Sequence, residues 1–329
     1  MKSSYSKKSS RTFTKKNCLQ ESFENILSFY ERFVLEPELG GNIFLGVLSA
    51  ENDEEMKKLK NELKRNLITN ILKIDRKTAT SRINKAKALT NEILHVLSKI
   101  LKADVLEVKA SLCYKGLFGS SQGLGEGLLE VGLSWDPILD LPVIPGSSFK
   151  GAVRSFCYNL LVSKETDKKE AERLCSTIFG SAGEGDNSGF AGVVSFLDAI
   201  PVEAGKRNRI LAADVLNPHY NAISNSYLRT ELEVSPVPIL HLCVNEGVTF
   251  EFIAYVPRRA EKVLDTKLIE NLELLAEKLD LKVSSTITRK AILVTAFLVG
   301  GALRLGVGAR TLKGYGRFKL EEVKVYAGA

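Results

Sequence analysis

The hydrophobic period of the chain changes near Asp104, and this change limits the fold more than any other feature of the sequence. Before it, apolar residues such as Ile83, Ile93 and Ile100 recur at helical spacing. After it, apolar and polar residues alternate along residues 105–113, which is typical of a strand with one buried face. We therefore predict a helical N-terminal region over residues 21–103, followed by a mixed α+β domain over residues 104–329.

Positive charge is concentrated at the N-terminus. No acidic residue precedes Glu21, whereas the basic residues before it are Lys2, Lys7, Lys8, Arg11, Lys15 and Lys16. A Ser/Lys-rich segment of this kind buries too little apolar surface to order itself, so residues 1–20 are predicted to form a flexible basic arm. It is either a solvated tail or an arm that touches nucleic acid. The whole chain has a formal charge of +7, which favours polyanionic partners.

The cysteines and the apolar segments indicate a cytoplasmic protein without membrane contact. The five cysteines form no C-x-x-C pair and sit mostly among apolar neighbours, as reduced core residues do. The longest apolar stretch, residues 291–303, is too short to cross a bilayer and is flanked by basic residues. We expect it to be a buried helix. Nothing in the sequence indicates a metal or another cofactor.

The order of predicted elements after Asp104 is that of a ferredoxin-like, RRM-like fold. With the helix at 264–279 treated as an insertion, the pattern is βαββαβ. The predicted strands are residues 105–113, 192–199, 210–215, 248–256 and 316–325, with a further extended segment at 128–135, and the predicted helices are 147–161, 264–279 and 291–303. Residues 180–189 and 217–238 form loops that are long for a compact domain, which is more often functional than accidental.

The segment Pro145-Gly-Ser-Ser-Phe-Lys-Gly-Ala-Val-Arg154 combines features of an anion site at the start of a helix. Its first glycine permits close approach of the backbone, and the two serines can cap the helix or bind a phosphate. The lysine and the arginine are four residues apart and share one helix face. The alternative is an ordinary serine cap beside two solvated cations. The residues predicted to contact a nucleic-acid backbone here are Gly146, Ser147, Ser148, Lys150, Gly151 and Arg154.

A second glycine-rich basic segment, residues 303–318, follows the predicted buried helix and leads into the last strand. It ends in no Gly-Lys-Ser/Thr, and it lacks the third glycine of a dinucleotide fingerprint. Lys313-Gly-Tyr-Gly matches the first half of an RNA-recognition signature, but Arg317 stands where that signature has an aromatic residue. Backbone contact is therefore predicted rather than base stacking. The residues predicted to take part are Gly306, Gly308, Arg310, Lys313, Gly314, Tyr315, Gly316 and Arg317.

Together these two segments resemble the motifs of RAMP superfamily proteins in type III CRISPR effectors, and they are similar to those of the sixth subunit of type III-B Cmr complexes. The similar segments are residues 131–137, 144–154, 178–181, 194–199, 214–220, 236–239, 306–310 and 314–318. They occur in the same order as in that family and extend from about residue 128 to residue 318. The helical first third matches no motif of the family that we can quote.

The resemblance implies a ferredoxin-like RAMP domain and a non-catalytic subunit of a Cmr antiviral effector complex. Such a subunit holds the 3′ part of the CRISPR RNA and caps the backbone filament that pairs with target RNA. The implied partners are CRISPR RNA, target RNA, other Cmr RAMP subunits and small helical subunits. In this family RNA cutting is assigned to an aspartate in a loop of a different RAMP subunit, and no residue of this chain clearly matches it.

The alternative function is a metal-independent endoribonuclease that processes CRISPR RNA, which requires a general base. The histidines are His95, His219 and His241. His95 lies on an apolar helix face and is predicted to be packed or interfacial. His219 lies in a Pro-His-Tyr turn, and we predict that it contacts RNA or a partner; it is also the base that the alternative would need.

Two acids and three aromatic residues can be explained by a structural role as well as by a functional one. Asp136 and Asp140 are the acids nearest the first basic segment and would be the ones to test for cleavage, but turn formation around Pro137 and Pro142 explains both. The aromatic residues Trp135, Tyr114 and Phe118 are predicted to lie in the core or at a subunit interface rather than to stack on bases.

Overall fold

The structure is a computed structural model, and the statements below refer to the part of the chain that it describes. That part comprises residues 25–35, 52–119, 123–125, 129–181, 189–216, 238–257, 266–282 and 285–328. The predicted basic arm at residues 1–20 lies outside it, and so does His219.

The N-terminal third is helical wherever it is described. Its elements are α1 (Ile26–Leu35), α4 (Asp53–His95) and the π-helical turn η1 (Val96–Ile100), which continues α4. The Asn52 side chain begins α4 by accepting a hydrogen bond from the backbone N–H of Glu55 at 2.8 Å. From this cap, α4 runs without interruption for 43 residues.

A central antiparallel sheet follows. Its strands are β1 (Asp104–Leu112), β6 (Ser195–Phe196), β7 (Ile200–Glu203), β10 (Thr249–Val256) and β11 (Phe318–Tyr326). The order is β11-β1-β10-β6, and β7 also pairs with β10. The predicted strand at residues 105–113 thus becomes β1, in the centre of the sheet between β10 and β11.

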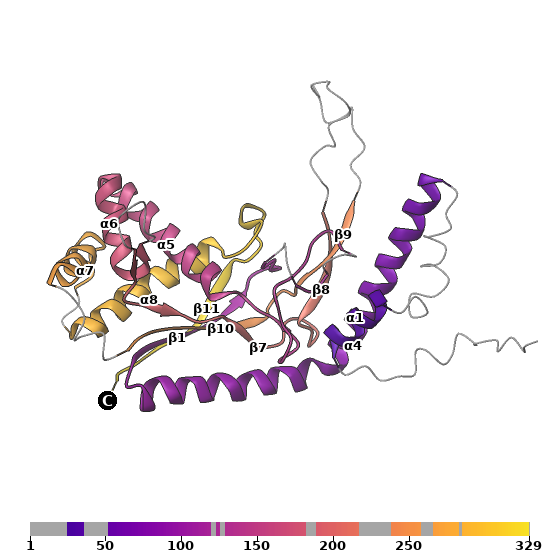
Figure 1. The fold of residues 1–329 in the computed structure, drawn as a ribbon, viewed down its shortest axis with the longest axis horizontal. Helices are drawn as coiled ribbons and strands as arrows, with labels where there is room; N and C mark the ends of the chain where they lie inside the picture. The colour runs from indigo at the N-terminus through magenta and orange to yellow at the C-terminus, as the bar shows by residue number, and fades with distance from the viewer. Residues whose placement is uncertain are drawn as a thin grey trace, which may run out of the picture.

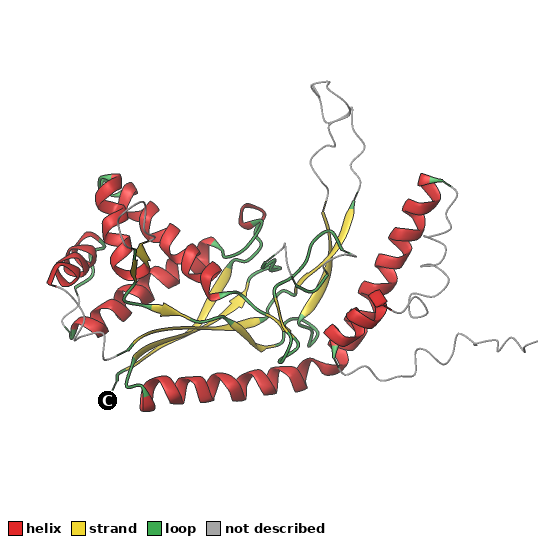
Figure 2. Cartoon of the chain, viewed as in Figure 1, coloured by secondary structure: helices red, strands yellow, loops and turns green. Residues whose placement is uncertain are grey.

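The alternation in β1 separates the two faces of this sheet. Leu106 and Val108 of β1, with Phe250 and Phe252 of β10, belong to the main core under four helices. These helices are α5 (Gly146–Ser163), α6 (Lys168–Phe179), α7 (Thr266–Lys278) and α8 (Ile287–Leu305). Figure 1 shows them gathered above the sheet, with α4 running along its other side, and Figure 2 shows the same layers by element type. The molecule is thus a mixed α+β structure.

Several elements differ from the sequence prediction. The helix α6 was not predicted, and residues 210–215 form part of a separate ribbon, β8 (Leu211–Leu216) with β9 (Ile239–Val244). The segment predicted as extended at 128–135 is described from Leu129 on, and of these residues only Trp135 enters a strand, because Leu129 and Leu133 instead pack into a second core with α1 and α4. The short hairpins are β2 (Trp135–Asp136) with β3 (Leu141–Pro142), and β4 (Gly180–Ser181) with β5 (Phe190–Ala191).

The stretch predicted as a buried helix lies within α8, which extends further than predicted at both ends. Among the described residues, no helix is both long enough and apolar enough to span a membrane. Of the four described cysteines, Cys157, Cys175 and Cys243 are buried as predicted, whereas Cys113 is exposed.

A buried ion pair fixes the N-terminal helices to the rest of the chain. Arg82 of α4 pairs with Asp75, about two helical turns earlier, and its Nη1 also donates to the Asp140 carbonyl at 2.7 Å. The Asp75 carboxylate accepts the backbone N–H groups of Ile210 and Leu211 at 2.9 and 3.0 Å. Burial raises the pKa of Asp75, and Arg82 and these N–H groups act in the opposite direction.

Asp140 supplies the second contact of this network. Its carboxylate accepts the backbone N–H groups of Ile26 and Leu27 at 2.7 and 3.0 Å, and so binds the first turn of α1. It also accepts the indole N–H of Trp135 at 3.2 Å. The α1 helix, the β2–β3 hairpin and α4 therefore meet at one buried site.

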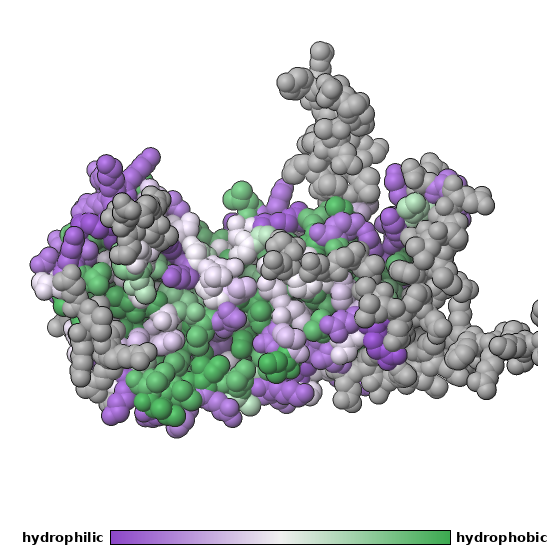
Figure 3. Space-filling view, in the orientation of Figure 1, coloured by the Kyte–Doolittle hydropathy of each residue, from purple (hydrophilic) through white to green (hydrophobic). Residues whose placement is uncertain are grey.

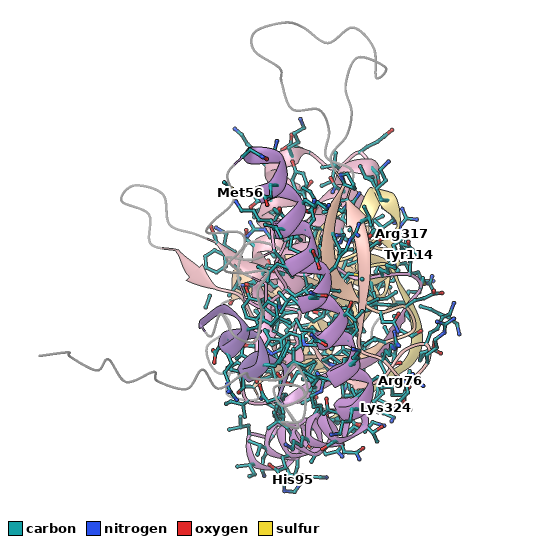
Figure 4. The ribbon with its side chains drawn as sticks, turned by 90° about the vertical axis from the view of Figure 1, so that its right-hand side faces the viewer. Met56, Arg76, His95, Tyr114, Arg317 and Lys324 are labelled. Atoms are coloured by element: carbon teal, nitrogen blue, oxygen red, sulfur yellow. The ribbon has the colours of Figure 1, made fainter. Side chains whose placement is uncertain are left out.

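Replacing Arg82 by Met should lower the free energy of unfolding by about 3–5 kcal/mol, because Asp75 and Asp140 would remain buried without their cation. Urea unfolding followed by circular dichroism measures the change. The matched control is Arg76→Met, since Arg76 is exposed on the same helix (Figure 4) and should change stability by about 0.5 kcal/mol or less. Equal losses in the two variants would contradict the role given to Arg82.

Two buried acids lie diagonally across neighbouring strands, on the sheet face that α4 covers. Glu107 of β1 and Glu251 of β10 are both buried, and Lys109 Nζ lies 3.1 Å from Glu107 and 3.9 Å from Glu251. Burial and the neighbouring Glu107 raise the pKa of Glu251 to about 7. Burial would also raise the pKa of Glu107, but hydrogen bonds from Glu251, Tyr326 and Lys109 lower it. Glu251 is therefore the member of the pair that holds a proton below about pH 7.

The proton on Glu251 should make stability depend on pH. Its carboxyl keeps the proton up to about pH 7 when folded but loses it near 4.5 when unfolded, so the stabilisation is complete below pH 4.5 and disappears as the pH rises to 7. In the wild type, the free energy of unfolding should decrease by up to about 3 kcal/mol as the pH rises, and Glu251→Gln should abolish this decrease. Urea midpoints between pH 4.5 and 8 measure it, with Glu270→Gln on α7 as control. An unchanged profile in Glu251→Gln would contradict the shared proton.

Candidate functional site

The first basic segment forms the beginning of α5. The helix starts at Gly146, and its N-cap residue, Pro145, makes no side-chain cap. Ser147 and Ser148 are exposed, so the alternative of an ordinary serine cap is not what the structure contains. The Gly146 N–H donates to the Asp198 carboxylate at 2.6 Å, and a Cβ at Gly146 would lie 2.7 Å from the carbonyl oxygen of Phe196. The glycine is needed for this approach to β6.

Lys150 and Arg154 share one face of α5, as their spacing predicts, and both line a cavity of about 520 Å³. We call it the α5 cavity; it lies between the first turns of α5, the β4–β5 hairpin and β6. Arg154 pairs with Glu172 of α6. Lys150 has no acidic partner within the described ranges and is the cation available to a ligand. Gly151 faces open space.

The second basic segment forms a loop over residues 306–317, the basic loop, between α8 and β11. Its backbone is fixed by hydrogen bonds of 2.9 Å from Val307 N–H to the Gly316 carbonyl and from Gly316 N–H to the Lys115 carbonyl. A third, also 2.9 Å, runs from Ala309 N–H to the Leu117 carbonyl. Residues 311–313 make a single 3₁₀ turn, η4 (Thr311–Lys313). The loop is therefore held against the end of β1.

The glycines of the basic loop have different roles. Gly316 has φ +61°, and a Cβ there would overlap the carbonyl oxygen of Val307. Gly308 is similarly close to Leu117 and Phe118. Only Gly314, with φ +90°, faces open space. We predicted these glycines for close approach of a polyanion, but the structure uses most of them to fold the loop on itself.

Tyr315 anchors the basic loop from below. Its side chain is buried, its hydroxyl donates to Asp214 of β8, and the guanidinium of Arg310 lies 5.2 Å from the centre of its ring. Lys115 Nζ is 2.9 Å from the same carboxylate. Burial would raise the pKa of Asp214, but hydrogen bonds from Tyr315 and Lys115 lower it. Tyr315 thus supports the loop rather than facing solvent.

The side chains that this loop exposes are basic. Lys313 and Arg317 are exposed and Arg310 is half-buried, and in the described residues Lys313 and Arg317 form no ion pair. Tyr114 is 40% exposed and lies beside Arg317 (Figure 4). The structure excludes a core position for Tyr114, for which a subunit interface stays a prediction, whereas Phe118 is buried as predicted. The reason is that the chain turns away from the sheet after β1.

The basic side chains at the start of α5 and those of the basic loop lie on different sides of α5. Figure 1 shows α5 beginning and α8 ending at the same end of the helical layer, and the Phe156 ring packs directly on Gly301 of α8. Lys150 and Arg154, however, lie on the flank that faces the β4–β5 hairpin and β6. A strand in contact with both clusters would therefore have to cross the start of α5.

The residues considered for catalysis are engaged elsewhere or lie apart. Asp136 accepts the N–H groups of Ile138 and Leu139 at 2.8 Å, which is the turn expected from its neighbours. His95, predicted to be packed or interfacial, is exposed at the end of α4 (Figure 4). His241 is buried opposite Asp214, and burial lowers its pKa. No group of three His, Cys, Asp or Glu side chains able to hold a metal occurs among the described residues.

Comparisons with known proteins identify relatives of the chain. The family model described as the RAMP superfamily matches residues 86–319, so the match begins within α4, upstream of the first similar motif. A curated relative, the CRISPR system CMR subunit Cmr6 of Saccharolobus solfataricus, is 27% identical over 241 residues, which is 73% of this chain and 66% of the relative. The match thus spans just under two thirds of that relative's length.

Solved structures include a chain of similar fold. A chain in the cryo-EM structure of the type III-B Cmr-beta complex bound to cognate target RNA has a TM-score of 0.58 and 22% identity, covering 93% of this chain and 98% of that one. The crystal structure of Cmr6 from Pyrococcus furiosus has a TM-score of 0.36 and 20% identity, covering 67% of this chain and 99% of that one.

Two alanine substitutions test the folding role of the glycines. Gly316→Ala should lower the melting temperature clearly, because its Cβ would overlap the Val307 carbonyl in addition to the strain of a positive φ. Gly314→Ala carries the strain alone and should cost about 1 kcal/mol. Thermal unfolding of both variants measures the difference. A loss at Gly314 equal to that at Gly316 would contradict the close approach described for the loop.

Proposed function

The chain belongs to the RAMP superfamily, and on this premise we propose that it is a non-catalytic, CRISPR-RNA-binding subunit of a type III-B antiviral effector complex. In this role it holds the 3′ part of the CRISPR RNA and caps the backbone filament. Support comes from the curated relative, which is itself a Cmr subunit, and from the likeness of fold to a chain of a Cmr complex bound to target RNA. The role implies a cytoplasmic location.

We further propose that the sheet and its helices form a ferredoxin-like βαββαβ unit. The chain order β1, α5, β6–β7, β10, α8, β11 and the sheet order β11-β1-β10-β6 support it. In this interpretation α6, the β8–β9 ribbon and α7 are insertions. The unit corresponds to the predicted domain at residues 104–329, and α1 and α4 to the helical region at residues 21–103.

The observation on which RNA binding rests is the presence of cations without acidic partners on two ordered supports. Lys150 stands on the first turns of α5, and Lys313 and Arg317 stand on a loop fixed by backbone hydrogen bonds. Neither support depends on a ligand to become ordered. Single-stranded RNA carries one charge per phosphate, and such cations release its counterions when they bind. Arg154 and Arg310 already contact Glu172 and Tyr315, so we assign them a smaller contribution to RNA binding.

A non-catalytic role agrees with the state of the candidate acids. Asp136 closes a turn, and Asp140 accepts three hydrogen bonds and lies beside Arg82. Asp140 is buried, so its carboxylate is not available to a scissile phosphate. Among described residues, nothing favours the alternative of a metal-independent endoribonuclease, and His219, which it needs, lies outside them.

The end of α4 offers a surface for the partner subunits that the proposal requires. Val96, Ile100 and Leu101 are exposed there, and Figure 3 shows apolar surface gathered at that end of the molecule. Other Cmr RAMP subunits or small helical subunits are the partners that we propose for the complex.

The double variant Lys150→Ala/Lys313→Ala should bind single-stranded RNA more weakly than the wild type at low salt. Its plot of log affinity against log salt concentration should be shallower by about 1.4, because each lost phosphate contact removes about 0.7 from the slope. Filter binding over a salt series measures both effects.

The matched control is Lys85→Ala/Lys87→Ala, which removes the same charge from exposed positions on α4, on the other side of the sheet. Its slope should equal that of the wild type. Equal losses in the two double variants would mean that net charge, rather than these two positions, governs binding. RNA recovered from the reactions should be intact, and a cleavage product would contradict the non-catalytic role.

A further inference from the structure

The α5 cavity is an open hollow large enough to receive a ligand, although the motif that led to it predicted only a surface contact. Its volume of about 520 Å³ lies within the range of ordinary ligand sites. One wall is the start of α5, the other is the β4–β5 hairpin, and Phe196 of β6 forms part of the lining between them. Phe196 is fixed by the rings of Phe149 and Phe179, whose centres lie 5.2 and 5.8 Å away.

An exposed aromatic ring stands on the hairpin wall. Phe190 of β5 lines the cavity and is 45% exposed. The hairpin that bears it is tied to the end of α6, because a Cβ at Gly192 would overlap the carbonyl oxygen of Ile178 and one at Gly180 would lie 2.6 Å from that of Phe190. A large apolar side chain left in water at a fixed position inside a cavity is a surface on which a flat ligand can stack.

The wall opposite Phe190, formed by the start of α5, offers one cation to a ligand. Among the described residues that line the cavity none is acidic, and Glu172 already engages Arg154. The start of the helix is itself occupied, since Asp198 accepts the Gly146 N–H. Lys150 is therefore the group that can bind one phosphate, and the helix terminus is not required for it.

We propose that the α5 cavity takes one unpaired nucleotide of an RNA strand, with its base against Phe190 and its phosphate at Lys150. This inference rests on the proposed RNA-binding function. It adds a site at which one base is turned out of the RNA strand. Stacking on an aromatic ring accepts every base, so the site is independent of sequence. A base within a duplex is not free to enter, so the nucleotide is unpaired.

The test compares two ligands of equal length, oligouridylate and an abasic phosphodiester, for binding to the full-length chain. Phe190→Leu should weaken oligouridylate binding by about 5- to 160-fold, the usual contribution of one stacked base, and leave abasic binding unchanged. Phe190→Tyr should retain binding. Lys150→Gln should lower the salt slope by about 0.7 for both ligands. The matched control is Phe297→Leu on α8, which alters a phenylalanine of similar exposure, 43%, outside the cavity.

The outcomes separate this site from the proposed function. If the wild type binds RNA and Phe190→Leu binds oligouridylate equally well, the nucleotide site is wrong and the RNA-binding function stands. If Phe190→Leu weakens both ligands alike, the hairpin has been disturbed and base contact is refuted. If the wild type binds neither ligand, the proposed function fails together with the site. Equal melting temperatures of the Phe190 and Phe297 variants show that folding is not the cause.

Discussion

A single guanidinium group, that of Arg82, joins parts of the chain that no local contact would hold together. It lies between Asp75 and the backbone of Asp140 in a place closed to water, where the charges are stable only in each other's presence. Asp75 also binds the start of β8, and β8 bears Asp214, which receives the hydroxyl hydrogen bond of Tyr315. The position of the basic loop therefore depends, through one strand, on an ion pair of the longest helix.

The sequence predicts those parts of the fold that are determined by local period. The alternation around Leu106 marks β1 and its buried face, and the apolar run at residues 291–303 marks α8. The sequence prediction missed α6 because most of its positions are charged or polar and its apolar stripe is narrow. Its start could have been recognised from Asp167, whose side chain caps it. The function of Asp140 was beyond such an analysis, because the helix that it binds begins 114 residues earlier in the chain.

The candidate site divides in the same way. Helical spacing alone places Lys150 and Arg154 on one face, and it does so correctly. Spacing gives no means of knowing that Tyr315 is buried, since its partner Asp214 is 101 residues away. The exposed ring of Phe190 stands in a two-residue strand between glycines, where no periodicity can reveal which side chain faces a cavity. The contacts that shape the candidate site join segments that are far apart in the sequence. Each sequence motif contains the residues of only one side of such a contact.

The basic loop shows what its own hydrogen bonds imply for recognition. Its turns are closed by backbone contacts with Leu117, Lys115 and Val307, all of which form within the chain itself. The conformational entropy of ordering this loop is therefore lost during folding and not again on association. In the proposed RNA complex, a flexible polyanion would meet a rigid partner, and the ordering that accompanies binding would fall on the nucleic acid. Such preorganisation would favour a long-lived complex, because release would require the separation of paired charges rather than the loosening of the loop.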